Sequence, residues 1–443
     1  MKRTISFTTL AVALALCLAG CGGNNNVANA GPTNATINTG DATNDQIVKF
    51  ELTVSSLTLA GSGGTATTGN LLSKSAEVEF AHQAGSFEPL ALVNIPPGTY
   101  SGASMTVSNP EVVVLNNAVP PAPVKITATL TSPSVTVTFT SPIIVTGTSS
   151  TVINFDLDLA GSVTLSGTPP TSASVTPKFN VTTATATNQG DDSGEIEDVH
   201  GSVTAINAPN FTIQNGQSSI TFATDSTTQF NDGITSLSQL KVGDIVEVDA
   251  TTKADGAKLA TKVEREEASA GEEAEGVITA VTGSPATQIT IAHQVDSSGS
   301  ATPPVTVDVS VSAGTQFLVR ADKLNLGGTT PAFDATHIAK GQRIEADTGS
   351  STASPMPADK IKLREQALVG TVSAASASGF TLTLNSSSAF ATLTGQTAVA
   401  VSIVSGTNLK VTPANGNVVR VRGLVFVNAG AYTMIAARVD GNN

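Results

Sequence analysis

Apolar residues stand at every second position along most of this chain, and this spacing limits the folds open to it. Clear examples, with polar residues between the apolar ones, are residues 50–54, 135–139, 153–159 and 380–384. Successive side chains of a β-strand point to opposite faces, so each run predicts a strand with one buried face. Apolar spacing of the helical kind is almost absent, and Gly, Pro, Asn and Asp separate the runs. We therefore predict an all-β protein.

The first folded unit is predicted to span residues 45–183. Its alternating runs are expected to form strands at 47–59, 76–80, 100–107, 112–115, 124–130, 135–139 and 151–159. About seven short strands separated by turns are typical of two packed sheets. The unit is therefore expected to be a β-sandwich.

Short motifs in this unit resemble those of known families. The turn Pro96-Pro97-Gly98 leads into a strand with Tyr100, which resembles the same feature of prealbumin-like sandwiches. The unit also resembles the domain of unknown function 4382 family, common in bacterial lipoproteins, which ends in a proline-bearing strand like residues 176–181. Both resemblances imply a sandwich.

The rest of the chain repeats itself three times, through five landmarks in one order. Each copy starts with a glycine-led strand, continues with a second strand and a Thr-led segment, and ends with a turn glycine and an Ala-led strand. The landmarks begin at Gly201, Phe211, Thr228, Gly243 and Ala260; at Gly276, Ile289, Thr315, Gly341 and Ala358; and at Gly370, Phe380, Thr407, Gly416 and Ala436. We predict repeats at 195–265, 274–365 and 367–441, with loop insertions at 297–304 and 327–333 in the second.

The repeat resembles the domain of unknown function 5666 family of bacterial lipoproteins. The resemblance rests on the glycine-led start, the turn Lys241-Val242-Gly243-Asp244 and the ending at residues 260–263. It implies small barrels of the OB-like kind. The first repeat matches best, because Gln342 and Asn417 replace the turn acid in the other two. The expected architecture is an N-terminal β-sandwich followed by three small β-barrel repeats.

Residues 1–20 have the parts of a bacterial export signal. Lys2 and Arg3 precede an apolar stretch at 10–18, which is too short to cross a bilayer. The run that follows resembles the lipobox of bacterial lipoproteins, with Cys21 preceded by Leu18, Ala19 and Gly20. The resemblance implies cleavage before Cys21 and its acylation; the alternative is an ordinary secretory signal with a chance cysteine.

Acyl chains on Cys21 would make a membrane the first partner of the mature protein. Residues 21–44 are rich in Asn, Ala, Thr and Gly and are expected to form a flexible tether. Gly22 stands where an aspartate would favour inner-membrane retention in the familiar sorting rule. The outer membrane or the cell surface is therefore the expected location.

The charge balance excludes one class of partner. The chain has 35 acidic and 22 basic residues and a formal net charge of −13. Nucleic acids and anionic membrane surfaces attract basic patches, so neither is an expected partner. Two acidic segments, at 191–198 and 264–275, are predicted to be linkers, which would leave the units strung along the chain.

The residues suited to catalysis are few and scattered. The four histidines have no second His or Cys at metal-ligand spacing: His82, His200, His293 and His337. Asp156 and Asp158 share a strand face and are expected to be solvated, with a Ca²⁺ site as the weaker alternative. No Gly-x-Ser-x-Gly motif joins a strand to a helix. We predict no enzyme, metal site or cofactor.

These expectations favour a non-enzymatic cell-envelope lipoprotein that acts as a structural or interaction module, with a protein or a glycan as its envelope partner. The alternative is an envelope protein that binds a small ligand, a glycan or a cation through barrel loops. The absence of Trp and the presence of only two Tyr disfavour sugar stacking. A hydrolase is a third reading, and it would require a cleft with convergent His and acidic side chains.

Overall fold

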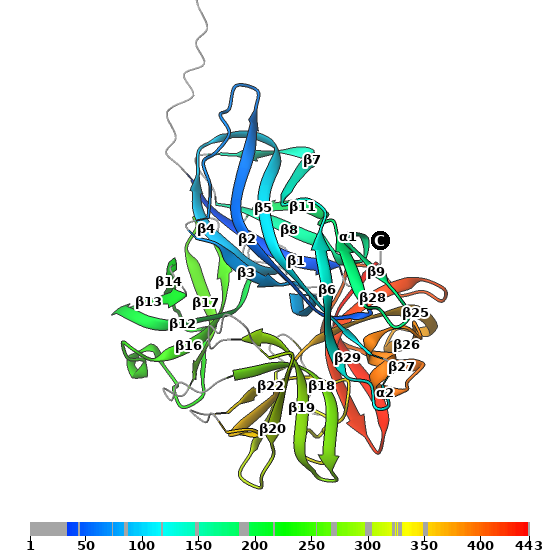
Figure 1. Ribbon diagram of the computed structural model, residues 1–443. Helices are drawn as coiled ribbons and strands as arrows, with labels where there is room; N and C mark the ends of the chain where they lie inside the picture. The colour runs from blue at the N-terminus through cyan, green and yellow to red at the C-terminus, as the bar shows by residue number, and fades with distance from the viewer. Residues whose placement is uncertain are drawn as a thin grey trace, which may run out of the picture.

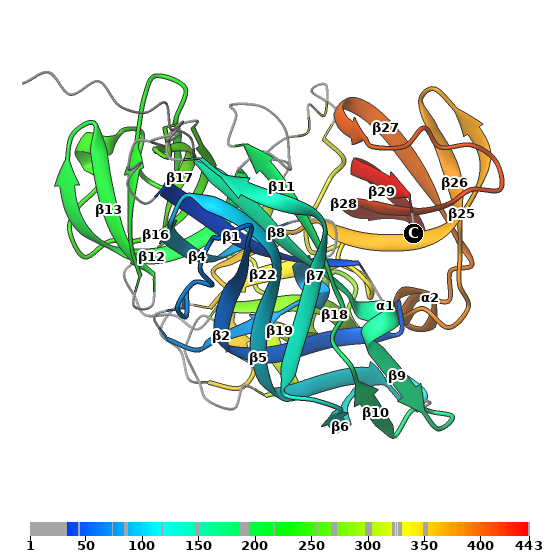
Figure 2. The same ribbon diagram turned by 90° about the horizontal axis from the view of Figure 1, so that it is seen from above.

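The computed structural model describes residues 33–441, apart from 43–44, 73, 84–86, 117, 147–149, 186–194, 216–217, 254, 267–272, 297–303, 321–323, 325, 327–329 and 349–352. Within this part of the chain nearly all regular structure is β, so the prediction of an all-β protein is confirmed. In both views of the ribbon a sandwich lies between the first and third repeats (Figures 1 and 2). None of the helices described is both long and apolar enough to cross a membrane.

The sandwich consists of two sheets. One has the strand order β11-β8-β1-β4, and the other has the order β3-β2-β5-β6-β10-β9, with β7 paired to β5. A short helix, α1 (Leu159–Ser162), follows β8. The strands are β1 (Thr33–Ala42), β2 (Ile47–Ser62), β3 (Ala76–Glu79), β4 (Phe87–Ile95), β5 (Gly98–Leu115), β6 (Pro123–Leu130), β7 (Ser134–Val145), β8 (Thr151–Asp158), β9 (Val163–Ser166), β10 (Ser172–Val175) and β11 (Phe179–Thr185).

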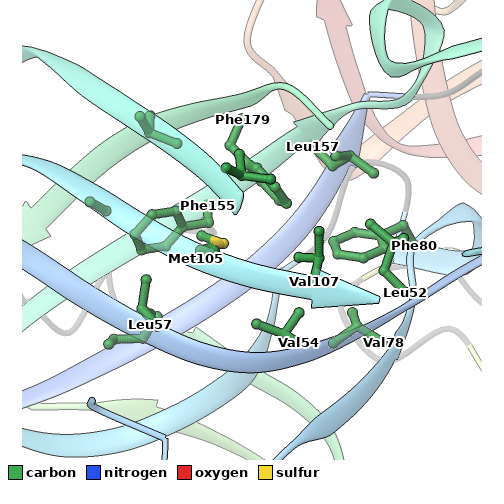
Figure 3. Packing of buried hydrophobic residues seen from close by; sticks show 14 of the residues in the cluster. Leu52, Val54, Leu57, Val78, Phe80, Met105, Val107, Phe155, Leu157 and Phe179 are labelled. Carbon is green, nitrogen blue, oxygen red and sulfur yellow. The ribbon is translucent and has the colours of Figure 1, made fainter. Parts of the chain in front are cut away.

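The alternating apolar residues of the two sheets meet in one core. Met105 from one sheet lies against Phe155 from the other, Leu52 lies further along the core beside Phe80, and all four are at most 1% exposed (Figure 3). Burying one such side chain contributes about 1.5–3 kcal/mol. At the predicted Pro–Gly turn, the buried Tyr100 donates its hydroxyl proton to the carbonyl oxygen of Pro96 at 2.8 Å. The apolar residues of the alternating pattern therefore point inward and form the core of the sandwich.

The prediction of a flexible tether over residues 21–44 is wrong for residues 33–42, which form β1. This strand pairs parallel with β8 and antiparallel with β4, so both of its edges are hydrogen-bonded. One of its polar side chains has a partner inside the sheet, since the buried Asn38 donates from Nδ2 to Oδ1 of Asn154 at 3.0 Å. The low apolar content that predicted a tether is tolerated because neighbouring strands cover β1 on both sides. Residues 21–32 lie outside the described part of the chain.

Each of the three repeats forms a β-sheet of its own. The third closes into a five-stranded barrel, and in the first the additional pairing of β14 with β17 joins five strands into a ring, with β15 paired to the outside of β17. The first repeat has β12 (Glu195–Asn207), β13 (Asn210–Asn215), β14 (Ser218–Ala223), β15 (Gln229–Asn231), β16 (Ile245–Thr252) and β17 (Lys258–Glu266); the second has β18 (Glu273–Gly283), β19 (Ala286–Asp296), β20 (Thr306–Ser310), β21 (Gln316–Val319), β22 (Arg343–Asp347), β23 (Met356–Pro357) and β24 (Lys360–Leu363); the third has β25 (Gln366–Ser376), β26 (Gly379–Leu384), α2 (Ala389–Thr394), β27 (Ala398–Leu409), β28 (Val418–Asn428) and β29 (Ala431–Gly441).

The landmark threonines make the same hydrogen bond in all three repeats. The hydroxyl groups of Thr228, Thr315 and Thr407 donate to the carbonyl oxygens of the landmark alanines, at 2.8, 2.9 and 2.6 Å. In each repeat the residue after the threonine pairs in parallel with the closing strand. The landmarks therefore occupy equivalent places in one pattern of strand pairing.

The turn glycines are equivalent as well. Gly243, Gly341 and Gly416 have φ angles of 97°, 86° and 89°, a left-handed conformation that favours glycine. Each donates its N–H to a carbonyl oxygen of the first strand of its repeat, and the residue after it accepts a hydrogen bond from the same strand residue. This exchange uses backbone atoms only, which explains why Gln342 and Asn417 can replace the turn acid of the first repeat.

Charged residues occupy four matching positions on the outer side of the two paired strands that close each repeat, and we call these four the charged face. In the second repeat Arg343 lies on the same side, beyond these four positions. Pairing aligns Glu247 with Glu264, Glu345 with Lys362, and Arg420 with Asp440. The complete faces are Glu247, Asp249, Lys262 and Glu264 in the first repeat; Glu345, Asp347, Lys360 and Lys362 in the second; and Arg420, Arg422, Arg438 and Asp440 in the third. The face is acidic in the first repeat, balanced in the second and basic in the third.

Ion pairs join the first repeat to the second. The guanidinium of Arg320, from the second repeat, contacts both Glu247 and Glu264 of the acidic face. Arg364 also approaches Glu247, at 3.9 Å, and pairs with Glu345 at 3.1 Å. All five side chains are at most 8% exposed. The units are therefore packed together, and the expectation that they are strung along the chain is wrong.

The third repeat contacts both the second repeat and the sandwich. Leu424 and Phe426 of β28 enter the apolar core of the second repeat. The basic face of the third repeat meets the sandwich, where Arg420 donates to the carbonyl oxygen of Asp41 at 2.9 Å. The linker prediction is also wrong where residues 195–198, 264–266 and 273–275 lie in strands; residues 191–194 and 267–272 lie outside the described part of the chain.

Candidate binding cavity between three units

A partly enclosed cavity of about 100 Å³ lies where the sandwich meets the second and third repeats. The sandwich contributes the end of β1, the start of β2, the 3₁₀ helix η1 (Ala81–Gln83) and α1. The second repeat contributes β18, β19 and β22, and the third contributes β25, β26 and α2. No single unit forms this cavity, so it exists only in the assembled fold.

The short helix α2 forms one wall. Ser388 caps its start by accepting a hydrogen bond from the N–H of Ala391 at 3.0 Å, as serine commonly does at this position. Gly341 allows the helix to approach the second repeat, because a Cβ atom there would lie 2.5 Å from a methyl carbon of Thr394. Phe390 of α2 thereby comes to line the cavity.

Two aspartates line the cavity: Asp41 at the end of β1 and Asp45 in the segment that joins β1 to β2. Asp41 is 1% exposed, and neither of its carboxylate oxygens has a well-aligned hydrogen-bond partner among the described residues, although the backbone N–H of Leu159 lies near enough to favour the charged form slightly. Burial raises its pKa well above the usual range, the carboxylate of Asp156 adds to the rise, and Arg420 opposes it. Burial also raises the pKa of Asp45 to about 7. The cavity therefore holds two acids that burial drives toward the neutral form.

Two glutamines from the repeats add amide groups. Gln294 donates from Nε2 to the carbonyl oxygen of Val48 at 2.5 Å, which ties the second repeat to the sandwich. Its Oε1 is buried and accepts no hydrogen bond from the described residues. The Nε2 of Gln366, a residue that is 8% exposed, is likewise unpartnered there. The cavity thus offers one free acceptor and one free donor besides the carboxylate of Asp41.

The basic side chains that line the cavity are already paired. Nδ1 of His82 lies 2.7 Å from Glu79, and Nε2 lies 2.6 Å from Glu88. Burial alone would lower the pKa of His82, but the two glutamates outweigh it and raise the pKa to about 10. Arg343 contacts Glu275 at 2.5 Å. An imidazolium held in this way does not accept a proton near neutral pH, so His82 is not available as a general base.

The residues singled out from the sequence are not brought together. His200 lies on β12, His293 is buried on β19, and His337 contacts Asp334 at 2.8 Å in the second repeat. Among the described residues, no group of three or more His, Cys, Asp or Glu side chains is placed to hold a metal ion. The lipidation residue and the lipobox lie outside the described part of the chain: Cys21, Leu18, Ala19 and Gly20.

The prediction of a solvated face for Asp156 and Asp158 is wrong. Asp156 is partly buried beside the basic face of the third repeat, and burial raises its pKa to about 6 while Arg420 and Arg438 oppose the rise. Asp158 caps α1 and accepts a hydrogen bond from the N–H of Gly161 at 2.8 Å. Both acids therefore have structural partners.

One part of the chain matches a known family. Residues 200–264, which cover most of the first repeat, match the family described as Domain of unknown function (DUF5666). No curated protein matches the chain. The family match identifies the first repeat only.

Two solved structures align with the chain at 14% identity. Drosophila Unr CSD456 aligns over 55% of this chain and 96% of its own, with a TM-score of 0.13. A multidomain protein with nucleic acid binding domains from Streptococcus pneumoniae aligns over 54% of this chain and 72% of its own, with a TM-score of 0.12. At these TM-scores we draw neither fold nor function from them.

Proposed function

We propose that the protein is a non-enzymatic lipoprotein of the cell envelope, held to a membrane by acyl chains on Cys21, and that its folded body serves as a structural or interaction module. The export signal and the lipobox support the anchor. β1 begins at Thr33, and the chain from Cys21 to this strand can reach at most roughly 40 Å. The folded body would therefore stay close to the membrane.

The observation that carries the structural role is the set of matched contacts between units. Buried ion pairs join the first repeat to the second, and a shared apolar core joins the second to the third. Such contacts would hold the units in one arrangement, which supports a role as a scaffold. Binding of a small ligand, glycan or cation through barrel loops is the alternative.

The finer family relations belong to this proposal. The sandwich would be a member of the domain of unknown function 4382 family, and the second and third repeats would be members of the same family as the first. The shared threonine and glycine hydrogen bonds support the relation among the repeats. Gly22 after the cysteine supports placement in the outer membrane or at the cell surface.

The anchor is tested by Cys21→Ala in cells supplied with a labelled fatty acid. We expect the wild-type protein to take up the label and to fractionate with the outer membrane, and the variant to remain an unprocessed precursor without label. Label on the variant would contradict the anchor. Wild-type protein in the inner membrane would contradict the placement.

The interaction role is tested by cross-linking in the native envelope. We expect a protein or glycan of the envelope to be captured reproducibly by the wild-type protein and not by Cys21→Ala, which is not anchored beside it. Nucleic acid is not expected, because the net charge is −13. Turnover of a substrate by the purified protein would contradict the non-enzymatic role.

A further inference from the structure

The cavity between the three units contains polar groups that no described residue satisfies. They are the two carboxylate oxygens of Asp41, Oε1 of Gln294 and Nε2 of Gln366. Nearly all buried polar groups of folded proteins have a hydrogen-bond partner, and exceptions gathered at one place call for an explanation. Three such side chains from three different units line the same cavity, so a ligand that satisfies them would explain the cluster.

The charge of the cavity selects the kind of ligand. Its cations, His82 and Arg343, are held by glutamates, whereas Asp41 and Asp45 form no ion pair within the described part of the chain. A cationic donor suits the oxygens of Asp41 and Gln294, and an ammonium group has three N–H donors. Nε2 of Gln366 requires an acceptor, which a hydroxyl group supplies. A ligand with both an ammonium and a hydroxyl group matches all of these atoms.

The size and the walls of the cavity limit the rest of the ligand. An engineered cavity of about 150 Å³ holds benzene, so a cavity of about 100 Å³ accommodates a ligand of about six non-hydrogen atoms or fewer. Leu368, Phe390 and Leu393 give it an apolar wall. A short alkyl chain between the two polar groups would contact this wall.

We propose that the cavity binds a compact amino alcohol, with its ammonium group on Asp41, its hydroxyl group on Gln366 and its alkyl chain against Leu368 and Phe390. This site is separate from the membrane anchor, so it does not depend on the proposed function. It also differs from the barrel loops named there, because it is formed where units meet.

The test is calorimetric titration of the purified protein with 4-amino-1-butanol at pH 8, where the ammonium group of the ligand would favour the charged form of Asp41 over the neutral form that burial favours. Pentylamine lacks the hydroxyl group, and 1,4-butanediol lacks the ammonium group, at the same number of heavy atoms. We expect the amino alcohol to bind at least tenfold more tightly than either and to raise the melting temperature. No binding, or equal binding of all three compounds, would overturn the proposal.

Two variants locate the site. Asp41→Asn is expected to weaken binding of the amino alcohol at least tenfold, whereas Asp255→Asn, in an exposed turn, changes nothing. Gln366→Leu is expected to reduce the affinity for the amino alcohol to that for pentylamine, because only the hydroxyl contact is lost. Wild-type affinity in both cavity variants would overturn the site. If Asp41→Asn does not fold, the affinity of Gln366→Leu for the amino alcohol still tests the site.

An ethanolamine phospholipid headgroup shares the ammonium group with a free amino alcohol, but its hydroxyl oxygen is esterified to phosphate, so a phosphate oxygen would be the acceptor for Nε2 of Gln366. Vesicles of phosphatidylethanolamine distinguish the two sources. Competition by these vesicles, but not by phosphatidylglycerol vesicles, would identify the headgroup as the occupant, and failure of both to compete would identify the free compound. Equal competition by both vesicles would show that the ammonium group is not recognised and would overturn the proposal.

Discussion

The first and third repeats pair their closing strands in the same way, but the outer sides of these strands carry opposite charge. Glu247 and Arg420 occupy equivalent positions, yet one meets a guanidinium from the second repeat and the other meets the sandwich. The inward residues of both strands are valines, such as Val248 and Val421, which are fully buried. The inner side of the strand thus maintains the barrel, while the outer side selects the neighbour.

This difference shows how similar units can be placed in a fixed order. A buried charge without a partner is strongly destabilising, so each face tolerates only a neighbour of opposite charge. The acidic face of the first repeat would repel the Asp41 and Asp156 side of the sandwich, which the basic face of the third repeat accepts. The four predictions that follow test this contrast.

The largest effect is expected from Arg320→Met. This change removes the closest partner of the buried Glu247 and Glu264, which keep Lys262 and, for Glu247, Arg364 at 3.9 Å, and it should destabilise the protein by about 3–5 kcal/mol. Urea unfolding followed by circular dichroism measures the loss. Arg265→Met is the control, because Arg265 makes only one long contact, and should change stability by about 0.5 kcal/mol or less. Equal losses of stability in the two variants would show that the contact of Arg320 with the charged face does not stabilise the fold.

Arg420→Met is expected to cost about 2–3 kcal/mol, which is less because Arg420 is slightly exposed and its main partner is a carbonyl oxygen. The same unfolding experiment applies. Lys125→Met is the matched control: it breaks the ion pair with Glu111 at the surface, where the lysine side chain is 55% exposed, and should cost about 0–1 kcal/mol. A loss for Arg420→Met within that range would show that only the first repeat depends on its charged face.

The acids opposite the basic face should make stability depend on pH. The pKa of Asp156 is raised from 3.8 to about 6 in the folded protein, so this group favours folding fully below pH 4 and loses that contribution as the pH rises to about 6. Asp156→Asn should therefore stabilise the protein by about 1–2 kcal/mol at pH 8 and have no effect at pH 4. Thermal unfolding at both pH values measures the change in stability. An equal change at pH 4 and pH 8 would show that the titration of Asp156 is not its cause.

The smallest losses of stability are expected at the landmark threonines, whose hydrogen bond is the same in all three repeats. Thr228→Val, Thr315→Val and Thr407→Val each remove one hydroxyl from an equivalent hydrogen bond and should each cost about 1 kcal/mol. Unfolding of the three variants compares the repeats directly. A loss several times larger in one repeat would show that the shared framework also differs among them.

Local sequence patterns predicted the fold class well, because alternation and turn residues act over a few positions. The same patterns were misleading for β1, whose sequence of Thr, Asn and Gly is ordered only by the strands on both sides. They also failed for the acidic segments. Glu264 belongs to a run of charges, but it alternates with the buried Val263 on a strand, and its partner Arg320 comes from another unit.

The cavity could not be predicted from the sequence. Asp41, Gln294 and Gln366 belong to three units, and nothing in the residues around each indicates that they meet. Asp45 carries no local signal either, since its raised pKa comes from burial between the units. A possible clue was the presence of charged residues between buried ones on the closing strands, which indicates that the outer side is covered as well.

The position of β1 has a mechanical consequence for a chain held at its N-terminal end. Because β1 is paired along its length on both edges, tension directed along the strand loads many hydrogen bonds simultaneously instead of opening them one by one. The sheet then resists shear where a strand at the edge would peel away. A pull on the N-terminal end would therefore be borne first by the interior of this sheet.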